Sequence, residues 1–351
     1  MKILVVGDSY ITSADFRSAL AELVDRHEVE FMDVSPQTDY EPSDDSEGRL
    51  IEYEGSPDQV AAALSGHEAL VVHGAPVSLK VLMASPALRL VCCARGGPVN
   101  IDTEAAARLG IEVVTTPGKN AGAVADLTLG LAIMLARSVD PAMRFLRDGG
   151  QVLSTFDGAR FFGSELSELS IGLVGLGRVG MEVSSRARGF GMEVFAYDPF
   201  VEPELISQAG AQSMNLRNLV RHCDIVSLHA RQTEDNRKMV NADLLADFKG
   251  GGLLINTARE GLLAEEPVLE SLRSGHLAGL AVDVFETNGP IAKAAANGEE
   301  RLIALPHIGG ATVRAIKRAA AIITARIEAF ENWESAPPVL RESGIPTDRN
   351  G

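Results

Sequence analysis

The chain has 351 residues, 46% of them hydrophobic and 23% charged, and carries a formal net charge of −16. This length predicts two domains of ordinary globular composition rather than one. The acidic balance, with no compensating stripe of lysine and arginine, disfavours nucleic acid and anionic membrane surfaces as partners. It leaves room for a small anionic substrate, because a few cations in a cleft set the local field.

Cysteine usage and hydropathy predict a cytoplasmic protein. Cys92, Cys93 and Cys223 form no CxxC pair and are expected to be small buried residues in a reducing compartment. The start, MKILVVGDSY, predicts a core strand rather than a signal peptide. No run approaches the roughly 18 apolar residues of a membrane-spanning helix. Metal-ligand spacing is also missing from the sequence, so no metal site is predicted.

The first third of the chain alternates apolar runs with helical spacing. Buried parallel strands are predicted at 2–6, 69–72, 88–93 and 111–115. Helices are predicted at 13–26 and 101–109, and the acidic, polar stretch 39–58 predicts a surface excursion. A further helix at 121–135 is poor in charge, so we expect it to be buried on most sides and to connect two domains.

The middle third repeats this alternation of strands and helices. Strands are predicted at 170–174, 193–197, 225–228, 253–256, 280–282 and 303–305. Because helical patterns separate most of them, right-handed parallel crossovers are expected. A long helix at 312–333 is ended by Pro337 and Pro338, and the polar tail at 339–351 is expected to be flexible.

A glycine-rich motif follows the predicted strand at 170–174. Gly175, Gly177 and Gly180 form the pattern G-x-G-x-x-G, and an amphipathic helix continues from it. The first glycine permits a tight turn, the second lets the backbone approach a pyrophosphate, and the third lets the helix pack close to the strand. The pyrophosphate would lie on the helix N-terminus, where free N–H groups favour an anion.

A carboxylate at the end of the next strand indicates which dinucleotide is bound. Asp198 follows the strand at 193–197, where it would accept hydrogen bonds from the ribose hydroxyls and repel a 2′-phosphate. NAD is therefore predicted in preference to NADP. The alternative is a structural glycine turn beside a solvated aspartate.

The order of these segments resembles the D-isomer-specific 2-hydroxyacid dehydrogenases, a family that includes phosphoglycerate dehydrogenases and glyoxylate/hydroxypyruvate reductases. The resemblance covers roughly residues 69–330. It is carried by Val99-Asn-Ile-Asp102 with 120–130, 175–180 with Tyr197-Asp-Pro199, Ile255-Asn-Thr-Ala-Arg259, and Asp283-Val-Phe285 with Pro306-His-Ile-Gly-Gly310.

The resemblance implies that Arg259 and His307 are the catalytic pair. A planar guanidinium can grip a carboxylate and polarise a neighbouring carbonyl. A histidine can take the alcohol proton in oxidation and return it in reduction. Hydride would pass to or from nicotinamide.

The resemblance also implies a set of cofactor contacts. Asp283 matches the residue that contacts the nicotinamide carboxamide, although a strand-end carboxylate satisfied by backbone N–H groups is an alternative. The full cofactor set is Gly175, Gly177, Arg178, Val179, Gly180, Asp198, His229, Ala230, Thr233, Thr257, Ala258, Arg259, Asp283, His307 and Gly309.

The run after Asp283 departs from the family pattern. The family's Asp-Val-Phe-x-x-Glu-Pro places a glutamate that pairs with the catalytic histidine, but Asn288 occupies that position here and Pro290 comes one place late. An amide can orient an imidazole without contributing negative charge. Asn288 is therefore a tentative third catalytic residue, and Glu286 is its rival if the loop is shifted.

The predicted substrate loop also departs from the family. The usual Gly-x-Gly, whose N–H groups bind the substrate carboxylate, is replaced by Arg95, Gly96, Gly97 and Pro98. Arg95 adds a cation, which favours a larger or more anionic substrate, unless it forms a salt bridge inside its domain. His73 and Gly74 end an earlier strand and are expected to face the same cleft.

These residues predict an α/β fold of two doubly wound, Rossmann-like parallel-sheet domains with a cleft between them. A flavodoxin-like substrate domain would comprise 1–119 plus 312–338, and an NAD-binding domain would comprise 120–311. The resemblance also implies a homodimer built on the NAD-binding domains.

The predicted function is NAD-dependent hydride transfer to or from a 2-hydroxy or 2-keto acid, with a sugar acid or a phosphorylated acid suggested by Arg95. Three alternatives stay open, one of them a structural Rossmann protein without activity. Asn288 suggests a formate-type dehydrogenase, although the loop around Arg95 suits a larger substrate. A non-catalytic, NAD-sensing corepressor of this fold can also keep Arg259 and His307.

Overall fold

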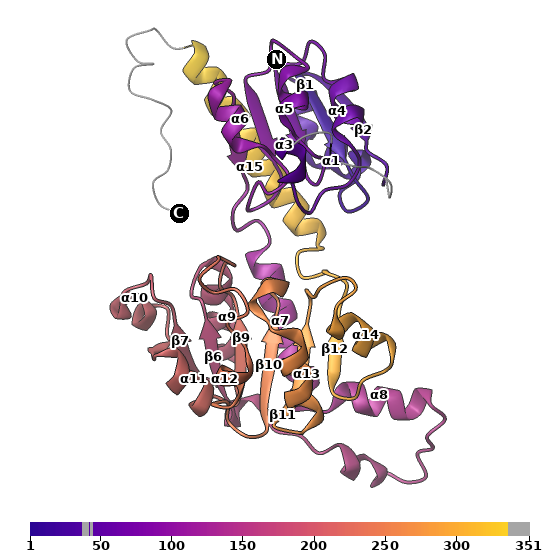
Figure 1. The fold of residues 1–351 in the computed structure, drawn as a ribbon, viewed down its shortest axis with the longest axis vertical. Helices are drawn as coiled ribbons and strands as arrows, with labels where there is room; N and C mark the ends of the chain where they lie inside the picture. The colour runs from indigo at the N-terminus through magenta and orange to yellow at the C-terminus, as the bar shows by residue number, and fades with distance from the viewer. Residues whose placement is uncertain (37–41, 43–44, 336–351) are drawn as a thin grey trace. The chain divides into compact units, whose positions relative to one another are not determined.

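The computed structural model describes residues 1–36, 42 and 45–335. The chain divides into two compact units (Figure 1). Unit 1 comprises Met1–Lys119 and Thr312–Gly351, and unit 2 comprises Asn120–Ala311. Both units are built on a parallel sheet with helices on its two faces, so the predicted α/β class is confirmed.

Unit 1 contains a five-stranded parallel sheet in the order β2-β1-β3-β4-β5. Its strands are β1 (Lys2–Gly7), β2 (Glu28–Asp33), β3 (Ala69–Val72), β4 (Leu90–Cys93) and β5 (Glu112–Thr115). The predicted strands in this third of the chain are confirmed, with starts one or two residues late at β4 and β5. The edge strand β2 was not predicted, because its residues are half-buried or exposed and polar positions interrupt its apolar ones.

Alternate residues of the unit 1 strands face two separate helical layers. Leu4 and Leu70 pack with α4 (Pro57–Ala63), α5 (Leu79–Met83) and α6 (Thr103–Arg108). Ile3 and Val71 pack with α1 (Ser13–Ala19) and α15 (Val313–Ser335). This alternation is the period-2 pattern of a sheet that is covered on both faces.

Two predicted segments of unit 1 need correction. The helix predicted at 13–26 is interrupted at Leu20 and forms α1 and α2 (Ala21–Val24), because the backbone of Leu20 leaves the helical region. The surface excursion predicted at 39–58 falls partly outside the described residues. Its described remainder holds α3 (Asp45–Gly48) and the buried Leu50 and Ser56, so it is partly packed rather than wholly exposed.

Unit 2 contains a seven-stranded parallel sheet in the order β12-β11-β10-β9-β6-β7-β8. Its strands are β6 (Ser170–Val174), β7 (Glu193–Tyr197), β8 (Gln212–Ser213), β9 (Ile225–Leu228), β10 (Gly252–Asn256), β11 (Leu277–Val282) and β12 (Leu302–Ala304). The predicted strands are confirmed to within a few residues. The two-residue edge strand β8 was not predicted, since both its residues are exposed and polar.

Helices cover both faces of the unit 2 sheet. One face carries α7 (Ala121–Ala136), α9 (Arg178–Gly189) and α10 (Pro203–Gln208). The other carries α11 (Leu216–His222), α12 (Ala242–Leu245), α13 (Glu265–Arg273) and α14 (Pro290–Ala296). The largely buried character predicted for the helix at 121–135 is confirmed, because α7 packs against α9 and against the strands β10 and β11.

The segment after α7 was not predicted as a helix. It forms α8 (Val139–Arg147), followed by the short helical turns η1 (Asp157–Phe161) and η2 (Leu166–Glu168). Among the described helices, none by itself is long and apolar enough to cross a membrane. Only α7 and α8 taken together, with a bend of 68° between them, meet that length and hydropathy.

Candidate active site

The glycine loop after β6 has the geometry that its three glycines predict. Gly175 adopts φ +96°, and a Cβ there would lie 2.6 Å from the backbone nitrogen of Ala230. A Cβ on Gly180 would collide with the carbonyl oxygen of Gly175. A Cβ on Gly177 would meet no atom within 4 Å. The first and third glycines are therefore needed for packing, whereas Gly177 borders open space at the start of α9.

Asp198 connects this loop to the end of β7. Its Oδ2 accepts the backbone N–H of Leu176 over 2.8 Å, and its Oδ1 accepts that of Phe200 over 3.0 Å. The carboxylate is only half-buried. Each oxygen keeps a further lone pair, so the side chain can accept from a bound ribose while it supports the glycine loop.

The loop after β10 carries Arg259 and is held by Asn256. The buried Asn256 amide donates to the carbonyl oxygen of Arg259 over 2.9 Å, and its Oδ1 accepts the N–H of Ala258 over 3.0 Å. Thr257 is also buried, with its hydroxyl 3.0 Å from that of Thr128 on α7. The Arg259 side chain is exposed. Sequence reasoning missed Asn256, although a polar residue at the end of a buried strand is a usable signal.

The loop after β12 carries His307 and is held by Asp283. His307 adopts φ +58°, a left-handed conformation that is rare for residues other than glycine. The Asp283 carboxylate accepts the N–H groups of Ile308 over 2.8 Å and Gly309 over 2.7 Å. Burial raises the pKa of Asp283, although these N–H groups act in the opposite direction. This geometry matches the alternative explanation for Asp283, a strand-end carboxylate satisfied by backbone N–H groups.

His229 lies beside the glycine loop, is half-buried as a whole residue and carries a neutral imidazole at pH 7. Burial lowers its pKa to about 4, and its Nε2 lies 2.9 Å from the hydroxyl of Ser227. Its Nδ1 is buried and has no hydrogen-bond partner among the described residues. Thr233, in the same turn, is exposed, and its N–H donates to the Asn236 side chain.

Asn288 and Glu286 lie on an exposed loop after β11. The buried carboxylate of Glu265 holds this loop, because its two oxygens accept the N–H groups of Glu286 over 2.8 Å and Ile291 over 3.0 Å. Within the described part of the chain, no hydrogen bond joins His307 to Asn288 or Glu286. Glu265 was also missed, because an acidic residue in a first helical turn is usually solvated.

The predicted cofactor and catalytic residues all follow carboxyl ends of unit 2 strands. The groups are Gly175, Gly177, Arg178, Val179 and Gly180 after β6, Asp198 after β7, His229, Ala230 and Thr233 after β9, Thr257, Ala258 and Arg259 after β10, Asp283 and Asn288 after β11, and His307 and Gly309 after β12. Parallel strands end at one edge of their sheet, so unit 2 brings this set to a common edge, where ligands of such folds bind.

The predicted substrate residues follow strands of unit 1. Asp8, after β1, accepts from the N–H of Gly74 over 2.6 Å and lies 2.9 Å from Nδ1 of His73. The ring of Tyr10 stacks on that imidazole. Burial would raise the pKa of Asp8, but the hydrogen bond and charge of His73 lower it. Burial also lowers the pKa of His73, so the pair at neutral pH is an aspartate and a neutral histidine.

Arg95 forms the intradomain salt bridge that was the alternative to substrate binding. Its guanidinium forms an ion pair with Glu52 and donates to the Glu52 carbonyl oxygen over 2.6 Å. Gly96 and Gly97 border the same loop, and a Cβ on Gly97 would meet no atom within 4 Å. The charge that Arg95 brings to this loop is therefore balanced within unit 1.

Lys119 is the basic residue of this sheet edge that sequence reasoning missed. It follows β5 in the run Thr116-Pro-Gly-Lys119 and is only 8% exposed. Burial lowers its pKa to about 8. A lysine just after a buried parallel strand was the available signal.

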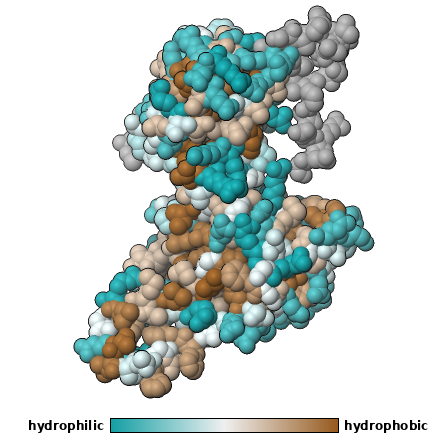
Figure 2. Space-filling view, turned by 180° about the vertical axis from the view of Figure 1, so that it is seen from behind, coloured by the Kyte–Doolittle hydropathy of each residue, from teal (hydrophilic) through white to brown (hydrophobic). Residues whose placement is uncertain are grey.

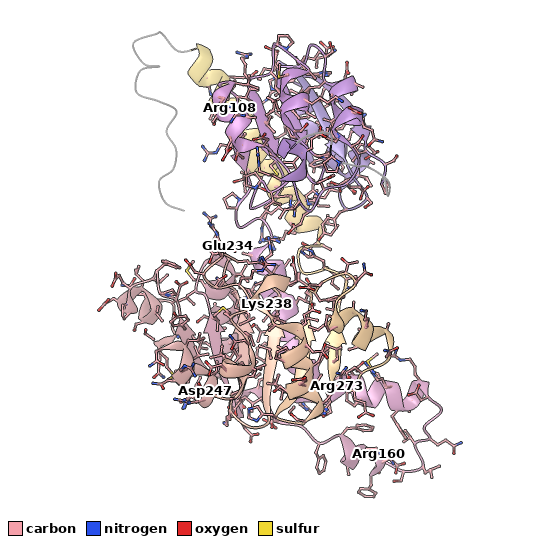
Figure 3. The ribbon with its side chains drawn as sticks, in the orientation of Figure 1. Arg108, Arg160, Glu234, Lys238, Asp247 and Arg273 are labelled. Carbon is pink, nitrogen blue, oxygen red and sulfur yellow. The ribbon has the colours of Figure 1, made fainter. Side chains whose placement is uncertain are left out.

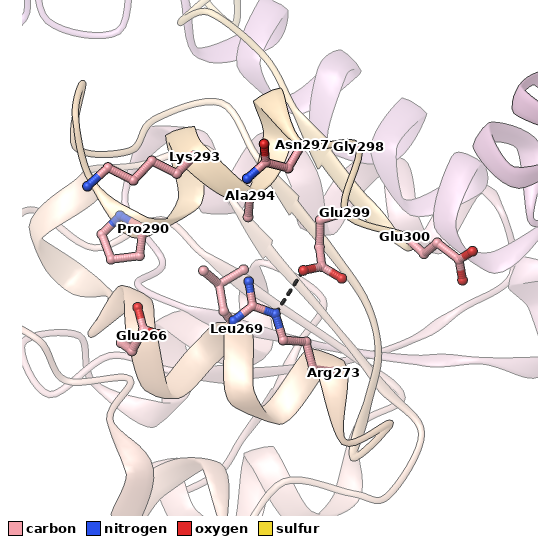
Figure 4. Close-up of a pocket in the computed structure, with 10 residues that line it drawn as sticks. All are labelled: Glu266, Leu269, Arg273, Pro290, Lys293, Ala294, Asn297, Gly298, Glu299 and Glu300. Atoms are coloured by element: carbon pink, nitrogen blue, oxygen red, sulfur yellow. Dashed lines mark hydrogen bonds and ion pairs between the residues drawn. The ribbon is translucent and has the colours of Figure 1, made fainter.

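A hollow of about 480 Å³ on unit 2 lies elsewhere (Figure 4). Residues of α13, α14 and the loop before β12 line it, and an ion pair of 2.8 Å between Arg273 and Glu299 crosses one side. None of its lining residues belongs to the predicted site. Among the described residues, no group of three or more His, Cys, Asp or Glu side chains could hold a metal ion.

A family model described as D-isomer specific 2-hydroxyacid dehydrogenase, NAD binding domain, matches residues 129–309. The chain belongs to this family. The match falls within unit 2 and covers the glycine loop and the Arg259 and His307 loops. The expected family and the use of NAD are thereby confirmed.

Curated relatives are similar over most of this chain. D-3-phosphoglycerate dehydrogenase of Rattus norvegicus is 35% identical over 264 residues, which is 75% of this chain and 48% of that protein. The Methanocaldococcus jannaschii protein of the same name is 32% identical over 286 residues, 81% of this chain and 53% of that protein. The chain thus spans about half the length of the curated relatives that it matches.

Solved structures have the same fold. A putative D-isomer specific 2-hydroxyacid dehydrogenase from a Polaromonas species has a TM-score of 0.77 at 24% identity, covering 95% of this chain and 97% of its own. D-lactate dehydrogenase from Escherichia coli has a TM-score of 0.74 at 22% identity, covering 96% and 99%. The two-sheet architecture is therefore that of this family.

Proposed function

We propose that this protein is an NAD-dependent dehydrogenase that interconverts a 2-hydroxy acid and its 2-keto acid. One observation carries the proposal. Arg259 and His307 follow strands of the same sheet as the glycine loop, and buried polar side chains, Asn256 and Asp283, hold their loops. His307 has a left-handed backbone conformation, which is strained for a residue other than glycine. Such strained residues cluster at functional sites, where the surrounding contacts hold them in place.

The residues of unit 2 fit a dinucleotide. Gly177 borders open space at the N-terminus of the 12-residue helix α9, where N–H groups and the helix dipole favour a pyrophosphate. Asp198 would accept from the adenosine ribose. NAD, when bound, supplies or accepts the hydride.

The chain's own residues would manage the carboxylate and the proton. Arg259 would hold the carboxylate beside the reacting carbon and polarise the adjacent carbonyl. In reduction, hydride reaches the carbonyl carbon, and His307 donates a proton to the oxygen that takes the electron pair. In oxidation, His307 accepts the hydroxyl proton as hydride leaves the carbon.

The proposed substrates are sugar acids or phosphorylated 2-hydroxy acids. The curated relatives named D-3-phosphoglycerate dehydrogenase support a phosphorylated acid. A formate-type dehydrogenase stays a second candidate because Asn288 stands at the family's glutamate position. A panel of 2-keto acids, with formate and NAD in a parallel assay, would be followed by absorbance of NADH. If formate is turned over and none of the 2-keto acids is, the protein is a formate-type dehydrogenase and the proposed function is wrong.

An NAD-sensing, non-catalytic protein is the competing class. It would bind NADH without turning over any acid of the panel. Binding is measured by the quenching or enhancement of NADH fluorescence on titration with the full chain. Tight NADH binding with no turnover of any acid would favour this class over the dehydrogenase.

We also propose a homodimer built on unit 2. The segment at 143–162, called the apolar arm below, carries exposed apolar side chains, namely Met143, Leu146, Val152, Leu153, Phe156 and Phe162. Phe156 and Phe162 are 83% and 85% exposed, and α8 has no buried residue. Figure 2 shows apolar side chains gathered over this end of unit 2.

Contacts between residues of the apolar arm also hold it together. The Arg160 guanidinium, labelled in Figure 3, lies 4.5 Å from the ring centroid of Phe145. A large exposed apolar patch is typical of a surface that another protein covers. We propose that a second copy of this chain covers it, because most soluble oligomers are symmetric homo-oligomers. Light scattering should give twice the chain mass. Serine at both Phe156 and Phe162 should give the single mass, whereas Phe200→Ser, an exposed control, should not. A wild-type monomer would contradict the dimer.

A cytoplasmic location completes the proposal. Cys92, Cys93 and Cys223 are all free and buried. Free buried thiols are typical of a reducing compartment, which supports this location.

A further inference from the structure

The turn after β11 carries an asparagine followed by a glycine, Asn288 and Gly289. The N–H of Gly289 donates to the carbonyl oxygen of Glu286 over 2.8 Å, so residues 286–289 form a reverse turn whose tip is exposed. Within the part of the chain that the structure describes, neither the side chain nor the backbone of Asn288 forms a hydrogen bond. The Asn288 amide is therefore exposed to water and is not restrained by hydrogen bonds.

Packing, rather than backbone conformation, fixes a glycine after Asn288. Gly289 has a φ of −74°, which any residue can adopt. A Cβ at this position, however, would lie 2.5 Å from Oε2 of the buried Glu265. That carboxylate accepts the N–H groups of Glu286 and Ile291 and so holds both ends of the turn. The fold therefore keeps an Asn-Gly pair at an exposed tip of unit 2.

An asparagine followed by a glycine can react with its own backbone. The backbone nitrogen of Gly289 attacks Cγ of Asn288 and closes a five-membered imide, the Cγ–Nδ2 bond breaks, and ammonia leaves with the proton of the glycine N–H. Water then opens the ring at one of its two carbonyls and leaves an aspartate or an isoaspartate. Glycine offers no Cβ to hinder this attack, and the reacting atoms belong to adjacent residues, so proximity favours the step.

A second pair, Asn297 and Gly298, follows the last residue of α14 and is held more firmly. The N–H of Asn297 donates to the Lys293 carbonyl oxygen over 3.0 Å, and the N–H of Gly298 donates to that of Ala295 over 3.1 Å. Ring closure needs rotation about the backbone of the asparagine, which breaks both bonds here. In the turn, only the bond of the Gly289 N–H has to break among the described residues. One further hydrogen bond slows the reaction about fivefold, because it has to open first.

We propose that Asn288 is a site of spontaneous deamidation, which converts it to an acidic residue faster than Asn297 in the folded chain. The reaction adds one negative charge to the loop after β11, the neighbour of the strand that leads to His307. What this charge does rests on the proposed function. Asn288 stands at the position where the family has a glutamate that pairs with the catalytic histidine, so the deamidated chain would carry an acid there.

The two pairs can be followed separately, because trypsin cuts between them. Cleavage after Arg273, Lys293 and Arg301 releases the peptides 274–293 and 294–301, each with one pair. The folded full chain is incubated at mildly alkaline pH in water enriched in heavy oxygen, which enters each residue that deamidates through the imide. Mass spectrometry of the two peptides gives both rates. Parallel samples are the chain unfolded in urea and the variant Asn288→Gln, whose fold is verified by its melting temperature and NADH binding.

In the folded chain, peptide 274–293 should acquire heavy oxygen about fivefold faster than peptide 294–301, or more. In urea the two rates should converge, because the hydrogen bonds that hold Asn297 are lost. Asn288→Gln should largely stop the labelling of the first peptide and leave that of the second, since a longer side chain has to close a less favourable six-membered ring. Equal rates in the folded chain, or slower labelling of peptide 274–293, would overturn the proposal.

Turnover tests the role of the charge separately from the modification. Incubated wild type and fresh Asn288→Asp should both show the falling limb of the pH–rate profile for keto-acid reduction at higher pH than fresh wild type, because a nearby carboxylate favours the protonated imidazole. Asp283, whose charge acts on His307, and Glu286 in the same turn are unchanged in every sample. Asn297→Asp, which adds its charge beside the hollow on unit 2, should leave the limb unmoved. If position 288 is labelled without a shift of the limb, the proposed role of the charge is wrong. If no keto acid is turned over but the labelling is found, the proposed function fails and the modification site stands.

Discussion

The backbone N–H of His307 donates a hydrogen bond of 3.0 Å to the carbonyl oxygen of Asp283, the residue directly after the neighbouring strand β11. The Asp283 carboxylate then accepts the next two N–H groups, of Ile308 and Gly309. Three consecutive N–H groups are therefore held by one residue. Because this clamp fixes the left-handed backbone of His307, Asp283 is the residue on which the orientation of that imidazole depends.

Asp283→Asn should weaken the clamp while keeping its size. An amide offers one acceptor oxygen, so one of the two N–H groups loses its partner, at a cost of about 1–3 kcal/mol in the free energy of unfolding. Turnover should fall as well, because the His307 loop loosens. Urea unfolding and kcat are the measurements, with Asp247→Asn as the control, because this half-buried carboxylate of unit 2 pairs with Arg217 and Arg221 rather than with backbone N–H groups. Unchanged stability together with unchanged kcat would show that the clamp is not needed.

His307→Ala should remove most turnover and leave NADH binding largely intact. A lost general acid–base group typically costs about 10²–10⁴-fold in rate. The measurement is kcat with the best keto acid, beside a fluorescence titration with NADH. His276→Ala is the matched control, because His276 contacts the Leu245 carbonyl oxygen and lies just before β11, at the opposite end of that strand from Asp283. Nearly full activity in His307→Ala would remove this residue from the mechanism.

Asp198 should select NAD over NADP by at least about 10-fold in kcat/KM, the size of one unfavourable charge contact. Asp198→Ala should narrow that ratio, since the repulsion of a 2′-phosphate is lost. The same substitution removes the acceptor of the Leu176 N–H, so kcat/KM with NAD should fall too. Equal use of both cofactors by the wild-type protein would contradict the prediction.

Asn288→Glu should move the falling limb of the pH–rate profile for keto-acid reduction to higher pH. A carboxylate near His307 would favour the protonated imidazole, which is the form that donates the proton. Glu286→Gln is the companion variant and should leave the limb where it is. The opposite pattern, a shift with Glu286→Gln and none with Asn288→Glu, would make Glu286 the supporting acid.

Lys119→Met should raise the free energy of unfolding at pH 7 by about 1–3 kcal/mol, because it removes a largely buried charge that has no hydrogen bond or ion pair with a described residue. Burial lowers the pKa of Lys119 from 10.5 to about 8. Between these values the unfolded chain binds more protons than the folded one, so wild-type stability rises with pH in this window. The variant should lack that rise. Urea unfolding at pH 7 and pH 9.5 tests this, and a loss of stability in the variant at pH 7 would contradict it.

The strands of both units could be predicted because they are buried on both faces. Ala69–Val72 and Ile225–Leu228 are fully buried; the first is an unbroken apolar run, and only Ser227 interrupts the second. The edge strands Glu28–Asp33 and Gln212–Ser213 were missed because an edge strand is partly solvated and its pattern resembles a loop. The helix Val139–Arg147 was missed for a similar reason, since no residue of it is buried.

Residues of the candidate site could be predicted only where they lie in a recognisable sequence motif. The glycine loop and the Arg259 and His307 blocks have such motifs, and the structure places all of them at strand ends. Asn256 and Glu265 act through backbone N–H and C=O groups, whose positions depend on tertiary structure. Lys119 could not be singled out either, because its burial and its lack of a described partner are properties of the folded unit.

The two adjacent thiols of β4 lie in different halves of the interior of unit 1. Cys93 packs in the layer formed with α4, α5 and α6, whereas Cys92 packs in the layer formed with α1 and α15. Burial raises the pKa of both thiols, so neither reacts with an alkylating reagent while its layer is closed. Modification of each thiol therefore reports separately on the opening of one side of the same sheet. The order in which the two thiols become modified under mild denaturant would record which helical layer opens first.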